Sequence, residues 1–226
     1  MSDDRDSKPL GLGIAQAARI AADAPTRRHA LRTRPFAALL LAAVGIAGVA
    51  KAEGGGTITG KVEATPAKYL EDTVVYLKAL PGTYPSQKRV MDQQGMKFVP
   101  HVLVVTQGDT VTFLNHDKVD HNVYSPDGEG YNLGNFKQGE NASYTFKKTG
   151  VYSQLCSVHP EMLAYIFVGQ NPYASVVDAK GNFTIKDVPP GTWQLEVWNA
   201  DKLKATEKTV TVAAGQTVTE SLAVKR

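Results

Sequence analysis

The chain has 226 residues, enough for one or two modest domains, and 42% of its side chains are hydrophobic. Its formal net charge of +3 comes from the first 52 residues, which hold eight basic and four acidic side chains. The remainder holds 17 basic and 18 acidic side chains. Because no Lys- and Arg-rich stretch interleaved with aromatic residues follows Ala52, the composition gives no support for a nucleic-acid partner.

The first 52 residues are typical of an export signal. An apolar run over residues 36–50, too short for a comfortable membrane span, follows four arginines at positions 27, 28, 32 and 34. Ala50-Lys51-Ala52 then fits a small-x-small cleavage site, so we predict a signal peptide at 1–52 and a periplasmic mature protein without stable membrane insertion. Ala30 stands where twin-arginine signals have phenylalanine, so the Sec and twin-arginine routes both stay open, as does a retained signal anchor.

Two strands are predicted at the start of the mature chain. T-I-T-G-K-V-E-A, from Thr57, alternates between apolar and polar residues, and T-V-V-Y-L-K-A-L, from Thr73, is more continuously apolar and therefore more buried. T-P-A-K-Y-L-E-D connects them. The following P-G-T-Y-P-S-Q-K is turn-forming and marks a candidate domain boundary.

From Val90 onward the chain is a series of short strand-like segments. H-V-L-V-V, T-V-T-F-L-N and A-S-Y-T-F are separated by turns such as Q-G-D and K-K-T-G. Apart from one short turn, no 3.6-residue period is present. This pattern predicts a Greek-key β-sandwich.

The most distinctive stretch is Val151 to Val168, V-Y-S-Q-L-C-S-V-H-P-E-M-L-A-Y-I-F-V, which holds the only cysteine. Cys156 is followed at three-residue steps by His159 and Met162. Pro160 opposes a helix, and the flanks are rich in β-branched and aromatic residues, so we predict a tight loop between two strands. Thiolate, imidazole and thioether are soft ligands that suit copper rather than magnesium or calcium. Metal ligation also explains a lone thiol in an oxidising compartment.

A blue copper site needs one Cys, two His and a weak axial Met, so a second histidine must come from elsewhere. His29 lies in the predicted leader. His121 directly precedes a strand-like run, whereas His116 lies within the preceding turn and is the alternative to His121. His101 follows Pro100 at the start of a strand and is expected to be structural.

At these residues the sequence resembles the cupredoxins of the plastocyanin and amicyanin kind. The turn N-H-D-K-V-D-H-N-V and the loop C-x-x-H-x-x-M, with Pro160 after the histidine, occur in the family's order. The resemblance implies a cupredoxin domain over residues 90–169 and one type 1 copper site, whose expected ligands are His121, Cys156, His159 and Met162. It also implies a hydrogen bond from Asn122 across to the Ser157 end of the ligand loop.

After Asn171 the chain resembles a second family. D-A-K-G-N-F, P-P-G and Val-rich hairpins are similar to the carboxypeptidase regulatory-like, or transthyretin-like, β-sandwich, whose opening G-x-I-x-G-x-V here begins at Gly56. We therefore predict an all-β chain in which the cupredoxin is inserted into a discontinuous sandwich of residues 57–84 and 172–224. The alternative is tandem domains, with Thr57 to Leu80 as extra cupredoxin strands. Trp193 and Trp198 are expected in the core.

These features predict a periplasmic one-electron carrier that is not an enzyme. The resemblance implies a redox partner, a cytochrome or a dehydrogenase, that docks transiently near His159, with Pro160 and Leu163 nearby. The alternative is a copper chaperone or delivery module, but the chain has four Met and no Met-rich run. Paired His-x-His segments, which multicopper oxidases need, are absent from the sequence, and His159 is poorly placed as a base for Cys156.

Overall fold

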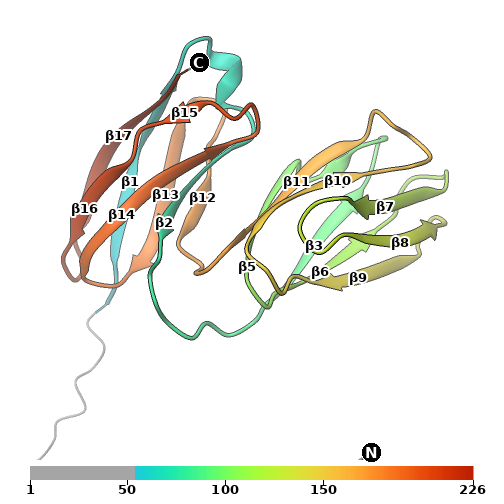
Figure 1. Ribbon diagram of the computed structural model, residues 1–226, viewed down its shortest axis with the longest axis horizontal. Helices are drawn as coiled ribbons and strands as arrows, with labels where there is room; N and C mark the ends of the chain where they lie inside the picture. The colour runs from blue at the N-terminus through green and yellow to red at the C-terminus, as the bar shows by residue number, and fades with distance from the viewer. Residues whose placement is uncertain (1–53, 226) are drawn as a thin grey trace, which may run out of the picture. The chain divides into compact units, whose positions relative to one another are not determined.

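A computed structural model describes residues 54–225, so the signal peptide predicted at 1–52 lies outside the described residues. The described chain forms seventeen β-strands and one short 3-10 helix (Figure 1). The strands make four sheets. The sheets pair around two separate apolar cores, which confirms the predicted all-β class with two sandwiches. Within residues 54–225 no helix is long and apolar enough to cross a membrane.

The first sandwich, here called the flanking sandwich, combines both ends of the described chain. Its first sheet has the order β13 (Asn182–Val188), β1 (Gly56–Ala64), β17 (Thr217–Lys225) and β15 (Lys204–Ala205). Its second sheet has the order β12 (Ala174–Val176), β2 (Thr73–Lys78), β14 (Gly191–Asn199) and β16 (Lys208–Val212). The 3-10 helix η1 (Ala67–Leu70) lies in the connection between β1 and β2.

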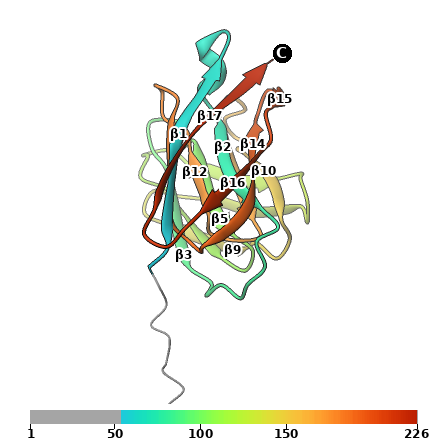
Figure 2. The same ribbon diagram turned by 90° about the vertical axis from the view of Figure 1, so that its left-hand side faces the viewer.

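Strands from distant parts of the sequence pair in this sandwich. β1 runs parallel to β17, with Thr57 opposite Thr217 and Ala64 opposite Val224 (Figure 2). β2 pairs antiparallel with β12 and β14. On this basis we propose that the segments 57–84 and 172–224 form one discontinuous domain.

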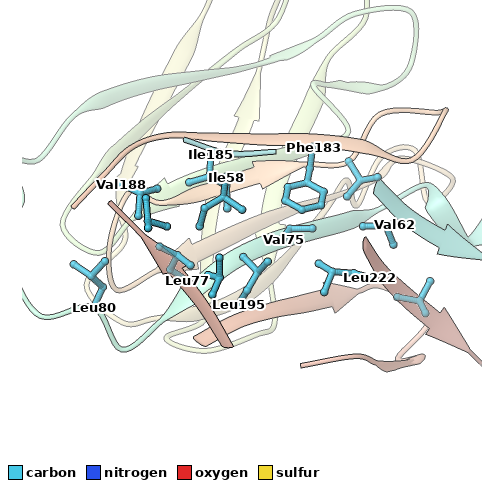
Figure 3. Packing of buried hydrophobic residues seen from close by; sticks show 14 of the residues in the cluster. Ile58, Val62, Val75, Leu77, Leu80, Phe183, Ile185, Val188, Leu195 and Leu222 are labelled. Atoms are coloured by element: carbon cyan, nitrogen blue, oxygen red, sulfur yellow. The ribbon is translucent and has the colours of Figure 1, made fainter. Parts of the chain in front are cut away.

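The core of the flanking sandwich follows from the alternation of its strands. On β1, Ile58 and Val62 point inward, where they meet Leu77 of β2 and Leu195 of β14 (Figure 3). Each such buried side chain stabilises the fold by about 1.5–3 kcal/mol relative to exposure. Gly60 lies between the inward residues of β1, where a Cβ atom would overlap the carbonyl oxygen of Glu220.

The second sandwich, here called the central sandwich, contains β3 to β11. One sheet has the order β5 (Val102–Thr106), β11 (Leu163–Gly169), β10 (Gly150–Leu155), β7 (His121–Ser125) and β8 (Tyr131–Phe136). The other has the order β4 (Phe98–Val99), β3 (Lys88–Gln93), β6 (Thr110–Leu114) and β9 (Asn141–Thr145).

Two strand pairings position the candidate site. β10 and β11 form an antiparallel pair from Gly150 opposite Val168 to Leu155 opposite Leu163, so residues 156–162 close one end of that pair. β7 begins at His121 and meets β10 at Tyr124 opposite Leu155. The predicted Cys-His-Met loop therefore lies between two strands, as expected, and His121 starts the neighbouring strand.

Candidate metal centre

Three predicted ligands converge at this end of the central sandwich. The Nδ1 atoms of His121 and His159 are 3.0 Å apart, and each lies 4.0 Å from Sγ of Cys156. No other group of three His, Cys, Asp or Glu side chains in the described part of the chain is arranged to hold a metal. Two imidazole nitrogens and one sulfur thus face a common point.

Met162, the fourth predicted ligand, is buried as well. Its side chain is 1% exposed and belongs to the same apolar cluster as Cys156. The Met162 backbone N–H donates to the carbonyl oxygen of His159 over 3.0 Å, which closes the loop into a turn. The loop therefore holds its thioether and its thiol in one apolar environment.

Asn122 connects the two segments that carry the predicted ligands. Its backbone N–H donates to Sγ of Cys156 over 3.3 Å, and its Oδ1 accepts a hydrogen bond from the backbone N–H of Ser157 over 3.3 Å. Its Nδ2 donates to Oδ1 of Asn132 and to the carbonyl oxygen of Gly134. The hydrogen bond expected between Asn122 and Ser157 is thereby confirmed.

The far side of the His121 ring meets a carboxylate that the sequence analysis missed. Nε2 of His121 lies 2.8 Å from Oδ2 of Asp117, and His121 itself is 0% exposed. Burial opposes ionisation of Asp117, but hydrogen bonds from the backbone N–H groups of Met96 and Gly95 and from His121 outweigh it and lower the pKa of this carboxyl. The only sequence signal was an acidic residue four positions before the histidine.

The other two described histidines do not join this group. The side chain of His116 is 57% exposed, and its Nδ1 lies 2.6 Å from Oδ2 of Asp92. Nε2 of His101 lies 3.0 Å from Oδ1 of Asp72, which fits the structural role expected for it. His29 lies outside the described residues.

The donor set fits copper. A thiol and two imidazoles are the ligands of a blue copper site, and a thioether completes it. The carboxylate of Asp117, which contacts His121, is engaged by a ring nitrogen and two backbone N–H groups instead of facing the common point. Oxygen ligands, which magnesium and calcium prefer, are therefore not supplied by Asp117.

Two family models match the sequence, and the first of them agrees with the copper-type donor set. Residues 86–169 match the family model described as "Copper binding proteins, plastocyanin/azurin family". Residues 169–220 match the model "Polysaccharide lyase family 4, domain II". The family match therefore does not support the expected carboxypeptidase regulatory-like identity of the flanking sandwich. The β architecture expected for it is present in the structure.

Several known proteins are similar to part of this chain. Amicyanin of Paracoccus denitrificans is 36% identical over 83 residues, which cover 35% of this chain and 63% of that protein. A copper-containing nitrite reductase of Thermus scotoductus SA-01 is 26% identical, with 42% of this chain and 25% of that chain covered and a TM-score of 0.36. A purple cupredoxin of Nitrosopumilus maritimus is 26% identical, with 36% and 99% covered and a TM-score of 0.33.

The assignment rests on the sequence matches, because TM-scores below 0.5 do not establish a shared fold. The family model covers residues 86–169, the segment that carries both predicted ligand regions. The matches support a copper-binding, cupredoxin-like domain within residues 86–169.

Proposed function

We propose that this protein is a periplasmic one-electron carrier with a single type 1 copper site, in which the ligands are His121, Cys156, His159 and Met162. The observation that carries the proposal is the convergence of two Nδ1 atoms and one Sγ atom from separate segments. The cupredoxin match supports electron transfer as the role of the domain. Copper, when bound, supplies the one-electron Cu(II)/Cu(I) couple.

The protein's own contribution is a rigid and largely dry cage. His121 and Cys156 are buried, and Asn122 fixes the loop to β7 through its hydrogen bonds to Cys156 and Ser157. Cu(II) and Cu(I) prefer different geometries, and donors that cannot rearrange impose one compromise geometry on both. The reorganisation that accompanies electron transfer then stays small.

His159 marks the side from which a partner is proposed to approach. It is the least buried of the three converging residues. Exposed apolar side chains belong to the same ligand-bearing segments, at Val119, Val158 and Leu163. A small apolar surface suits the transient encounter of a redox pair, with a cytochrome or a dehydrogenase as partner.

The alternative role, a copper chaperone or delivery module, has less support. Such a module needs accessible ligands that a target can take over, whereas Cys156 and Met162 are 2% and 1% exposed. The burial of these two side chains therefore favours a carrier over a delivery module.

We propose export by the Sec or twin-arginine route, with removal of residues 1–52. We also propose that the discontinuous flanking sandwich, 57–84 and 172–224, is of the carboxypeptidase regulatory-like kind. The strand pairing of β1 with β17 supports the discontinuity.

Visible absorption and EPR of the protein after addition of Cu(II) test the proposal. We expect an intense blue band that is lost in Cys156→Ser and in His121→Ala. The matched control is His116→Ala, which removes the nearby exposed histidine and should keep the band. A colourless protein that binds only Cu(I) would contradict the carrier and favour the delivery module, and loss of the band in His116→Ala alone would overturn the choice of His121.

A further inference from the structure

We propose that Asp117 is a positioning residue that lowers the reduction potential of the copper site through its hydrogen bond to His121. This inference rests on the proposed function, because it requires His121 to be a copper ligand. It adds a residue that neither the sequence motif nor the family match assigns.

The two ring nitrogens of His121 face different groups. Nδ1 faces Cys156 and His159, and Nε2 faces Oδ2 of Asp117 at 2.8 Å. A metal-bound imidazole uses the lone pair of one nitrogen, so its proton must reside on the other. With Nδ1 as the ligand atom, Nε2–H is the donor and the Asp117 carboxylate is the acceptor.

Asp117 is fixed in place by contacts that do not involve the metal site. Its Oδ1 accepts from the backbone N–H of Gly95 over 2.7 Å, and its Oδ2 accepts from that of Met96 over 2.9 Å. Its own N–H donates to Oδ1 of Asn115, a residue that is 1% exposed. The carboxylate is therefore held against the ring and does not need to be ordered when the metal binds.

A carboxylate in this position acts on the two oxidation states unequally. It draws the Nε2 proton toward itself and raises the electron density at Nδ1, so the imidazole becomes a stronger donor. A stronger donor and a nearby negative charge both stabilise Cu(II) more than Cu(I). The potential is expected to be lower than it would be with a neutral partner.

The chain contains a matched control for this effect. His116 and Asp92 form a second histidine–carboxylate pair at 2.6 Å, but His116 is exposed and does not belong to the converging group. Asp92→Asn thus removes the same kind of charge from the same sandwich without touching His121. The reduction potential of Asp92→Asn therefore measures how far the loss of a negative charge shifts the potential in general.

Redox titration of the blue band in the wild type, Asp117→Asn and Asp92→Asn tests the inference. Removing a partner of this kind typically weakens metal binding about 10-fold or more. A tenfold loss of Cu(II) affinity relative to Cu(I) corresponds to a rise of about 59 mV for one electron. We expect that rise in Asp117→Asn, with the band retained, and no comparable change in Asp92→Asn. An unchanged potential in Asp117→Asn, or an equal shift in both variants, would overturn the inference.

A second measurement does not depend on the stability of the variant. In the ¹⁵N NMR spectrum of the Cu(I) wild type, His121 should show a proton on Nε2 that exchanges slowly with water. Absence of that proton contradicts the inference even if Asp117→Asn fails to fold. A wild type without a blue band would instead refute the proposed function, so the two failures are distinguishable.

Discussion

Ser157 donates its backbone N–H to Oδ1 of Asn122 over 3.3 Å, although the two residues are 35 positions apart. The same Asn122 directs its own N–H to Sγ of Cys156. One buried side chain thus joins the start of β7 to the loop that follows β10, and both segments carry predicted ligands.

Asn122→Ala should loosen this connection. The variant loses the acceptor for Ser157 and leaves the oxygens of Asn132 and Gly134 without their Nδ2 donor, which costs about 1–3 kcal/mol of stability. The backbone N–H to Cys156 remains, so we expect a blue protein that releases copper to a chelator about 10-fold faster or more. Asn135→Ala, an exposed change on β8, is the control. Equal release rates in both variants would show that Asn122 does not hold the loop.

Met162→Leu tests whether this residue is an axial ligand or a core methionine. The change keeps the apolar volume but removes the thioether, so an axial role predicts a retained blue band with an altered EPR spectrum and a higher potential. Met91→Leu is matched, because Met91 is equally buried in the same apolar cluster. If the two variants have the same spectrum and potential, Met162 serves only in packing.

Glu196 should make the stability of the protein depend on pH. Its Oε1 lies 2.7 Å from Nζ of Lys78, and its Oε2 accepts a hydrogen bond from Tyr76 over 2.7 Å. Burial opposes ionisation of Glu196, but these two partners outweigh it and lower the pKa of the carboxyl. The stabilisation is therefore present above the ordinary pKa of about 4.3 and lost as pH falls through the lowered value.

The measurement is urea denaturation of the wild type and Glu196→Gln at pH 7 and pH 3. We expect the variant to be less stable by about 1 kcal/mol at pH 7 and the difference to shrink at pH 3. Glu63→Gln, an exposed change on β1, controls for the loss of a charge. A difference that stays the same at both pH values would disprove the ionic role.

Gly60→Ala should destabilise the flanking sandwich. The new Cβ would overlap the Glu220 carbonyl oxygen and approach the Phe183 ring to 2.8 Å, so β1 must move away from its neighbours. Such overpacking costs about 1–3 kcal/mol, measurable by thermal or chemical unfolding. Gly54→Ala is the control, since its Cβ would meet nothing within 4 Å. We expect both variants to keep the blue band, and its loss in Gly60→Ala would mean that this strand supports the copper site directly.

Local pattern was sufficient for much of the architecture. The alternation of Thr57 to Ala64 predicted a half-buried strand, and β1 buries Ile58 and Val62 as expected. Pro160 and the β-type flanks predicted a loop between strands, and residues 156–162 lie between β10 and β11. These predictions succeeded because the period of a strand and the restrictions of proline act over a few residues.

The sequence favoured His121 over His116, because His121 directly precedes a strand-like run and matches the cupredoxin motif, but it left His116 as the alternative. In the fold both histidines have an aspartate within hydrogen-bonding reach. Only the folded chain shows that His116 turns outward to Asp92, whereas His121 enters β7 and faces Cys156. The contact between Asp117 and His121 could not be predicted from the sequence either. Asp117 is held in place by backbone N–H groups of Gly95 and Met96, which belong to a different hairpin.

The sequence by itself determined the β class, the ligand loop and the chemistry of its donors, since Cys156, His159 and Met162 lie within seven residues. The tertiary structure showed that His121 and not His116 lies beside Cys156 and His159, that Asp117 contacts the His121 ring, and that β1 lies beside β17. Those relationships join residues far apart in the chain. They depend on how whole sheets pack, and that packing is set by the sum of many buried contacts rather than by any local pattern.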